Sequence, residues 1–358
     1  MTKANDPVLI GTKLIKNRIT MAPTVKFDYA GEDGMAADAH VEHYRKRAAG
    51  GAGLICVEAT AVTPDGRFCR SHMGIWDDSQ IPGQARIAEA IHSEGAAALV
   101  QLNHAGSGTF PEMGDSIGPS DLQMGEKKVR GLSLEELHDI QDAFVQAAVR
   151  MKKAGYDGVQ LHGCHGYLIN AFMSPYTNLR NDEYGGKTEN RAKFASEIIQ
   201  KIRELCGPDF IISMRIAGAE KTIEESIEMA EIYVKNGLDY LQVSFGTSQA
   251  FESSPDENFS FTSLQQYGKA FYRHFKGRIP VSTVGGILTV EEARSLIEND
   301  RTDTIDLARG LLADPAFADA ILSGSQYVKC FGCRSCQYGP GEKHRCPAAL
   351  RRGMKGCD

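Results

Sequence analysis

Two histidines and a tyrosine stand close together in one short segment, residues 162–168. His162, His165 and Tyr167 follow an apolar run at 158–161 that predicts a strand, so their side chains leave it near its carboxyl end. In an α/β barrel this end carries the chemistry. Two imidazoles can donate hydrogen bonds to one oxygen, and a phenol with a pKa of about 10 keeps its proton until a strong base forms beside it. The cluster is typical of reduction next to a carbonyl, whereas each residue alone is equally typical of a core histidine or a wall aromatic.

The elements that must position this cluster alternate regularly. Eight apolar, β-rich runs indicate strands at 19–22, 54–58, 97–102, 158–161, 210–215, 240–244, 279–283 and 304–308. Helices are expected at 38–49, 79–94, 188–206, 263–275 and 314–322, and after Ser133, Thr222 and Thr289, each of which begins a capping-box pattern. The alternation predicts an α/β protein with a single (β/α)8 TIM barrel rather than an open doubly wound sheet, and no GxGxxG follows the first strand.

Two further features complete the predicted architecture. Residues 8–18 hold two apolar patches around Gly11 and Thr12, which indicate a short N-terminal hairpin that closes the bottom of the barrel. The loops at 103–132 and 245–261 are longer than usual. Loops of this size are either lids or plain surface excursions, and the sequence leaves both options open.

Composition limits the class of partner. The 358 residues are 42% apolar and carry 40 basic and 46 acidic side chains, a net charge of −6. Basic residues are scattered, which argues against a nucleic-acid or anionic-membrane surface and favours a small soluble substrate. The polar start lacks the apolar segment of a signal peptide, and no run of eighteen apolar residues occurs, so we expect a cytoplasmic protein.

Glycine pairs follow the last two predicted strands. The strand at 279–283 runs into Gly285 and Gly286, and the strand at 304–308 runs into Arg309 and Gly310. Barrels often bind phosphate at these two loops, where glycines let backbone amides approach the oxygens and an arginine supplies positive charge. Glycine pairs also occur in ordinary turns, so the pattern is only consistent with a phosphate site.

Five of the nine cysteines crowd between residues 330 and 357. Cys330, Cys333 and Cys336 form CxxCxxC, and Cys346 follows with a proline behind it. Four thiolates at such spacing hold either a tetrahedral zinc or a [4Fe-4S] cluster, and spacing alone does not choose between them. The segment 326–358 is therefore expected to be a cysteine-rich metal-binding tail that packs on a barrel of residues 1–325, with Cys357 as an alternative fourth ligand.

The chain resembles the Old Yellow Enzyme family of FMN-dependent oxidoreductases over nearly its whole barrel. The resemblance rests on the order and spacing of Met21–Pro23, Glu58–Val62, Gln101–Gly106, His162–Leu168, Ser174–Pro175, Asn178–Gly186, Glu189–Arg191, Arg215 and the two glycine-rich loops. It implies FMN at the carboxyl end of the barrel. It further implies that FMN is contacted by Pro23, Thr24, Ala59, Gln101, Arg215, Gly285, Gly286, Arg309 and Gly310.

The same resemblance implies an ene-reductase. His162 and His165 would bind the carbonyl oxygen of an α,β-unsaturated substrate, the β-carbon would accept hydride from flavin N5, and Tyr167 would protonate the α-carbon. Neither role needs a metal at the histidines. Val25 departs from the family pattern, because many relatives place a polar side chain there against the flavin. No histidine lies between residues 166 and 273, so a dienoyl-CoA substrate is not predicted.

The tail resembles the cluster segment of the branch that contains 2,4-dienoyl-CoA reductase and trimethylamine dehydrogenase, which favours [4Fe-4S] over zinc. Those relatives continue into electron-feeding domains. Electrons are therefore expected from NAD(P)H directly or from a separate ferredoxin or flavoprotein, and a homo-oligomer is a further option. Two alternatives stay open: an oxidative amine demethylase, disfavoured because the only tryptophan, Trp76, lies in a loop, and a flavin-free, zinc-bearing barrel subunit.

Overall fold

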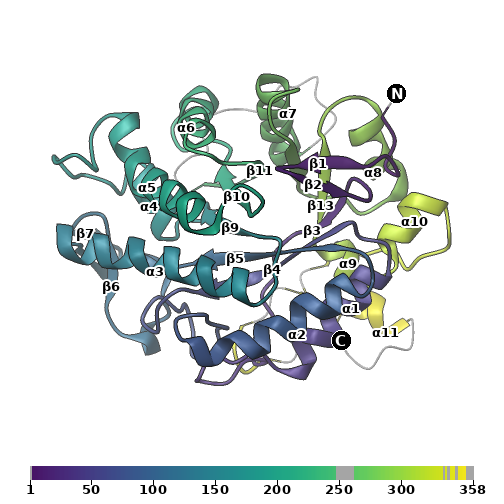
Figure 1. Ribbon diagram of the computed structural model, residues 1–358, viewed down its shortest axis with the longest axis horizontal. Helices are drawn as coiled ribbons and strands as arrows, with labels where there is room; N and C mark the ends of the chain where they lie inside the picture. The colour runs from purple at the N-terminus through teal and green to yellow at the C-terminus, as the bar shows by residue number, and fades with distance from the viewer. Residues whose placement is uncertain (1, 247–261, 334, 337–338, 343–345, 352–358) are drawn as a thin grey trace.

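Eight parallel strands form a closed barrel, as the sequence predicts (Figure 1). The computed structural model describes residues 2–246, 262–333, 335–336, 339–342 and 346–351. The barrel strands are β3 (Ile19–Met21), β4 (Leu54–Ala61), β5 (Ala97–Asn103), β9 (Gly158–Gly163), β10 (Ile211–Ala217), β11 (Tyr240–Ser244), β12 (Val281–Val284) and β13 (Thr304–Leu307). Each overlaps one predicted strand, and consecutive strands pair in chain order until β13 closes on β3.

Helices surround the barrel, most of them near predicted positions, whereas the short helices at 168–173, 309–313 and 347–351 were not predicted. They are α1 (Asp38–Ala49), α2 (Ile81–His92), α3 (Leu134–Lys153), α4 (Leu168–Met173), α5 (Thr188–Cys206), α6 (Ile223–Lys235), α7 (Ser263–Phe275), α8 (Val290–Glu298), α9 (Arg309–Ala313), α10 (Phe317–Ser323) and α11 (Pro347–Arg351). Short 3-10 turns lie at η1 (Asp78–Gln80), η2 (Gly106–Gly108) and η3 (Pro111–Met113).

The three predicted capping boxes differ in how far they form. Ser133 and Glu136 make the reciprocal pair at the start of α3. Thr222 and Thr289 accept the backbone N–H of the glutamate three residues on, but that glutamate does not return a bond to the cap. Glu225 instead contacts Arg191, because the charged partner is stronger than a second amide. At Thr222 and Thr289, the single bond between the threonine side chain and the glutamate N–H is therefore enough to begin a helix.

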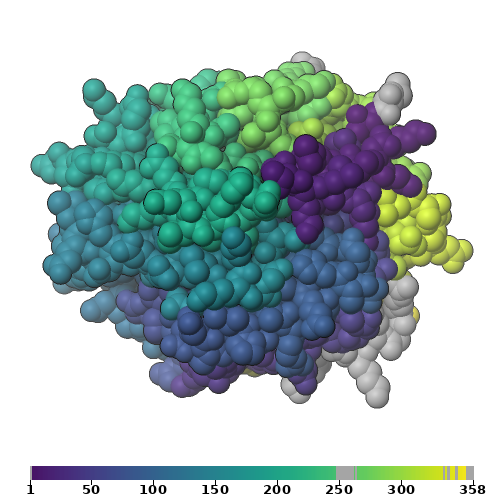
Figure 2. All heavy atoms as spheres, in the orientation of Figure 1, coloured from purple at the N-terminus to yellow at the C-terminus, as the bar shows by residue number. Residues whose placement is uncertain are grey.

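The N-terminal hairpin closes the amino end of the barrel, as expected. Strands β1 (Val8–Ile10) and β2 (Lys13–Ile15) pair antiparallel, and the purple N-terminal residues lie on the face turned to the viewer in Figure 2. Their buried side chains form one apolar cluster with the first residues of four strands, namely Leu54, Ala97, Ile211 and Tyr240. The hairpin thus keeps water out of the end of the barrel opposite the predicted chemistry.

A chain of amides crosses the barrel interior. Gln101 Nε2 donates to Gln160 Oε1 at 2.8 Å, Gln160 Nε2 to Gln242 Oε1 at 2.6 Å, and Gln242 Nε2 to Asp306 Oδ1 at 3.0 Å. Thr20 Oγ1 also donates to that carboxylate. Burial raises the pKa of Asp306 to about 6. This fully buried polar layer links five strands and lies within a predominantly apolar core.

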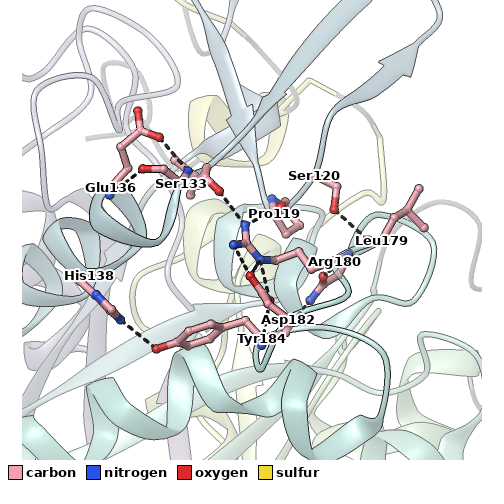
Figure 3. A network of polar contacts seen from close by, with 11 residues as sticks. Pro119, Ser120, Ser133, Glu136, His138, Leu179, Arg180, Asp182 and Tyr184 are labelled. Carbon is pink, nitrogen blue, oxygen red and sulfur yellow. Dashed lines mark hydrogen bonds and ion pairs between the residues drawn. The ribbon is translucent and has the colours of Figure 1, made fainter.

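The long segment 103–132 is not a simple loop. It contains a small sheet of β6 (Ser116–Gly118), β7 (Leu122–Met124) and β8 (Lys127–Gly131), which the sequence did not predict. Arg180 holds the carboxyl ends of the parallel strands β6 and β8, since its Nη1 donates to the carbonyls of Pro119 and Leu132 at 2.9 and 2.6 Å, while Asp182 fixes the guanidinium (Figure 3). The segment 178–186 therefore ties this sheet to the barrel.

The cysteine tail contacts the barrel beside α9. Buried Cys330 and Cys346 share an apolar cluster with Ala313 of α9, and the carboxylate of Asp314 accepts the backbone N–H of Val328 at 2.8 Å. The yellow helix α11 lies close to α9 in Figure 1. Among the described residues, no helix combines the length and apolar character needed to cross a membrane.

Candidate active site

His162, His165 and Tyr167 lie together at the carboxyl end of β9. His162 is the last but one residue of this strand, and Tyr167 stands just before α4. Between them the chain turns sharply, and His165 has a φ of +65°, a left-handed conformation that non-glycine residues rarely adopt. The backbone N–H of His165 donates to the carbonyl of Phe245 after β11, at 3.2 Å. The turn thereby aims both imidazoles into the same space.

The two imidazoles contact each other and one serine. His162 Nε2 lies 3.1 Å from His165 Nδ1, and His165 Nε2 lies 2.8 Å from the hydroxyl oxygen of Ser244. Burial lowers the pKa of His162, and Arg215 and His165 lower it further through their charges. The His165 side chain reaches solvent, yet desolvation by its neighbours and the charge of Arg215 lower its pKa too. Both rings are therefore neutral near pH 7 and bind as hydrogen-bond donors or acceptors.

Cys164 lies near the two histidines, with one ligand atom of each residue within 4.8 Å of the others. The sequence did not mark this cysteine as a ligand. Burial raises the pKa of its thiol to about 12, so a metal would have to displace that proton. The expectation that the histidines act without a metal stays a prediction.

Tyr167 packs directly against His162. The ring centroids are 4.6 Å apart, and burial raises the pKa of the phenol to about 12. Gly108 makes room for the ring, because a Cβ at this glycine would lie 2.8 Å from Cε1 of Tyr167. The phenol therefore stays protonated over the whole physiological pH range, as a proton donor must.

An aromatic stack supports Tyr167 from the other side. Phe68 stacks on Tyr167 at 6.2 Å and on His72 at 3.8 Å, and Phe27 meets Phe68 edge-on at 5.9 Å. His72 is fully buried; its Nδ1 accepts the backbone N–H of Phe68 at 3.3 Å, and its Nε2 lies 2.7 Å from the carbonyl of Ala59. These contacts join the turn after β4 to the proton-donor candidate.

Arg215 lies beside the candidate residue His162. In the strand register it is opposite His162 on β9 and Gln242 on β11. Its side chain is 9% exposed, and its Nε has no hydrogen-bond partner among the described residues. No salt bridge within the described part of the chain involves Arg215. Its guanidinium can therefore meet a group that the described residues do not provide.

Ala59 and Gln101 face each other across a bulge. The register of β4 on β5 shifts between Val57 and Ala59, which brings Ala59 opposite Gln101. Both residues are buried, and Gln101 already donates one amide hydrogen to Gln160. Pro23 and Thr24 follow β3 directly and are half-buried. All four predicted residues lie at or near the carboxyl ends of neighbouring strands.

The predicted phosphate residues follow β12 and β13. Gly285 and Gly286 have φ of +117° and +72°, conformations that favour glycine. Gly310 lies in the first turn of α9, where a Cβ would lie 2.5 Å from the ring of Phe317. Arg309 is half-buried, and its positive charge acts on the thiols of the tail. The two loops therefore lie next to the cysteine tail.

The four tail cysteines are free thiols that gather in one region. Cys330 and Cys346 are buried in the same cluster, Cys336 is half-buried and Cys333 is exposed. Gly332 has a φ of +68° and points its N–H at the sulfur of Cys330, 3.5 Å away. Amides directed at sulfur are typical of cluster-binding loops. Cys357 lies outside the described residues.

Sequence reasoning missed two residues of this site. Ser244 ends the predicted strand 240–244 with a polar side chain at the carboxyl edge, a signal that could have marked it. His72 lies in a turn without periodicity, and nothing in the sequence places it near Ala59. Its role follows only from the folded chain.

Comparisons with known proteins match most of this chain. The model of the NADH:flavin oxidoreductase / NADH oxidase family matches residues 5–326. An NADH oxidase from Thermoanaerobacter brockii is 37% identical over 339 residues, covering 90% of this chain and 52% of the relative. A solved complex of 2-naphthoyl-CoA reductase superposes with a TM-score of 0.86 at 26% identity, covering 93% of this chain and 54% of that one. The Old Yellow Enzyme homologue of Zymomonas mobilis gives 0.78 at 25% identity, covering 94% and 97%. The chain spans about half the length of the first two relatives.

Proposed function

We propose a function from one premise: the chain belongs to the NADH:flavin oxidoreductase / NADH oxidase family, the Old Yellow Enzyme family. The proposed function is the FMN-dependent reduction of the C=C bond of an α,β-unsaturated carbonyl compound, with NAD(P)H or a partner protein as the source of electrons. The observation that carries it is the convergence of His162, His165 and Tyr167 at the open end of the barrel.

The residues present fit FMN. Arg215 offers a buried guanidinium nitrogen without a partner among the described residues, which suits the acceptor-rich edge of the isoalloxazine. Gly285 and Gly286 adopt the positive φ values of an amide-rich loop, and Arg309 adds positive charge for the phosphate. Pro23, Thr24, Ala59, Gln101 and Gly310 complete the proposed set. When bound, FMN would supply the hydride that adds to the β-carbon.

The chain's own residues have the remaining tasks. The neutral imidazoles of His162 and His165 hold the carbonyl oxygen and stabilise the negative charge that develops on it. Tyr167 gives its proton to the α-carbon, and solvent returns a proton to the phenolate. The balance is one hydride and one proton added across the double bond, with NAD(P)H oxidised to restore the reduced cofactor.

The walls of the site favour a flat, apolar substrate body. Phe68 is buried in an apolar cluster to which Val25, Phe27 and Tyr167 contribute. Planar rings stack well on such walls. We therefore propose cyclic or aryl-substituted enones and enoates as the first substrates to test. Val25 cannot hydrogen-bond, so it contributes packing only.

The tail is proposed to hold a [4Fe-4S] cluster through Cys330, Cys333, Cys336 and Cys346. The support is the donor set itself together with the amide of Gly332 directed at sulfur. The division into a barrel of residues 1–325 and a tail of residues 326–358 is part of the same proposal. Replacing Cys333 with serine is expected to lower the iron content and the absorbance near 400 nm; unchanged iron would remove Cys333 from the ligand set.

The main test compares wild type with Tyr167→Phe in separate half-reactions. Reduction of the flavin by NADH or dithionite should proceed at the same rate in both, because the phenol takes no part in it. Reoxidation of the reduced enzyme by 2-cyclohexenone should slow by about 100-fold, the range expected when a general acid is lost. Equal reoxidation rates would exclude Tyr167 as the donor. Oxidation of methylamines but not reduction of enones would favour the amine demethylase instead.

A further inference from the structure

We propose that Ser244 is a positioning residue that selects the tautomer of His165, so that Nδ1–H points at the substrate oxygen. The inference rests on the proposed function of the histidine pair and adds a residue to it. Ser244 is the last residue of β11 and is 1% exposed. Its hydroxyl oxygen lies 2.8 Å from His165 Nε2.

A hydrogen-bond donor at Nε2 of His165 is necessary because of the number of protons on the ring. A neutral imidazole carries one N–H, and the other ring nitrogen is an acceptor. His165 has a partner at each nitrogen, His162 Nε2 at 3.1 Å and Ser244 Oγ at 2.8 Å. If Ser244 accepts from Nε2–H, then Nδ1 presents a lone pair to the mouth and repels a carbonyl oxygen. If Ser244 donates to Nε2, then Nδ1 carries the proton and can donate to that oxygen.

The surroundings favour the donating serine. The hydroxyl of Ser244 also lies within reach of the buried thiol of Cys164, but a thiol sulfur is only a weak acceptor. The serine hydrogen is therefore directed to the stronger acceptor, His165 Nε2. The backbone N–H of His165 is bound to Phe245, the residue after Ser244. Ser244 thus holds the ring of His165, and the next residue, Phe245, holds its backbone.

His162 is the ring left free to adjust. Its Nδ1 is buried and has no hydrogen-bond partner among the described residues. A change of its tautomer therefore breaks no bond at Nδ1. Before substrate binds, His165 Nδ1–H donates to His162 Nε2. Exchange with water removes the proton at His162 Nδ1 and returns one at Nε2, and both rings can then donate to a carbonyl oxygen. Ser244 fixes the donor at His165 Nδ1, and substrate binding favours the donor at His162 Nε2.

The experiment compares Ser244→Ala with Ser244→Thr, which keeps the hydroxyl. Reoxidation of the reduced enzyme should slow by about 100-fold in the alanine variant, the lower end of the range for losing one donor to a developing oxyanion. Binding of 2-cyclohexenone to the oxidised holoenzyme should weaken as well. The threonine variant should recover most of the loss. Cyclohexene, which has the same ring without the oxygen, should bind all three proteins equally, because only the hydrogen bond differs.

Nitrogen-15 spectra of histidine-labelled, ligand-free protein give a readout that does not depend on activity. The His165 signal, assigned by its loss in His165→Asn, should report Nδ1–H in wild type and Ser244→Thr and shift toward Nε2–H in Ser244→Ala. An Nε2–H signal in wild type overturns the proposal whether or not the protein reduces enones. An Nδ1–H signal in a wild type that does not reduce enones would retain the tautomer assignment and reject the proposed function. If Ser244→Ala does not fold, Ser244→Cys, a much weaker donor, takes its place.

Discussion

His72 offers the sharpest test of how the wall behind Tyr167 is built. Its two ring nitrogens bind two backbone groups, the N–H of Phe68 at 3.3 Å and the carbonyl of Ala59 at 2.7 Å. Burial lowers the pKa of His72 to about 3, so the ring stays neutral, accepting at Nδ1 and donating from Nε2. Replacing it with phenylalanine keeps a ring against Phe68 but removes both bonds.

The expected loss follows from those two contacts. A buried polar group left without its partner costs about 1–3 kcal/mol, so His72→Phe should lower the free energy of unfolding by about 2–6 kcal/mol. An asparagine places its oxygen near the position of Nδ1, and a glutamine places its amide nitrogen near that of Nε2. His72→Asn should therefore keep the bond to Phe68, and His72→Gln the shorter bond to Ala59. We expect the stability order wild type, Gln, Asn, Phe.

Urea denaturation of the four proteins measures this order, and the reoxidation rate with 2-cyclohexenone measures its effect on chemistry. In a Tyr167→Phe background, His72→Phe should no longer change that rate, because its influence passes through the position of Tyr167. Equal stability of wild type and His72→Phe would refute the hydrogen-bond argument. An undiminished kinetic effect without Tyr167 would show that His72 acts by another route.

Three further expectations follow from the described contacts. Asp306→Asn should abolish a fall in stability between about pH 4 and 6, because a carboxyl whose folded pKa is raised to about 6 favours folding below its unfolded pKa and loses that contribution as pH rises; urea titrations at each pH measure it. Gly108→Ala should slow enone reduction by displacing the Tyr167 ring, whereas Gly339→Ala, where a Cβ meets nothing within 4 Å, should not. Reoxidation by enone should be independent of pH from 6 to 10, because Tyr167 has a pKa of about 12; a loss of rate with an apparent pKa below 10 would contradict the burial of the phenol.

The barrel could be predicted because its signals are local. Each strand is a short apolar run, and helices α3, α6 and α8 begin at the polar caps Ser133, Thr222 and Thr289, so pattern alone places them within a few residues. The small sheet at 116–131 escaped because its strands are short and polar, and they are held by Arg180 from a distant part of the chain. Long-range side-chain contacts of this kind leave no periodic trace in the sequence.

The candidate site likewise contains residues that local sequence could predict and residues that depend on long-range contacts. His162, His165 and Tyr167 could be grouped because six residues of chain join them at the end of one strand. The contribution of Ser244 depends on the closure of β11 against its neighbours, and the contribution of His72 on a turn that folds back over Ala59. The amide chain from Gln101 to Asp306 likewise needs four strands to come together in one layer.

The left-handed backbone at His165 limits which substitutions evolution can introduce at this position. With a φ of +65°, the tolerated replacements narrow to glycine, asparagine, aspartate and few others. Of these, asparagine alone keeps a neutral side chain that both donates and accepts. Substitution of His165 by asparagine is therefore the change that would preserve recognition of the substrate oxygen. A bulkier or branched side chain would instead distort the turn.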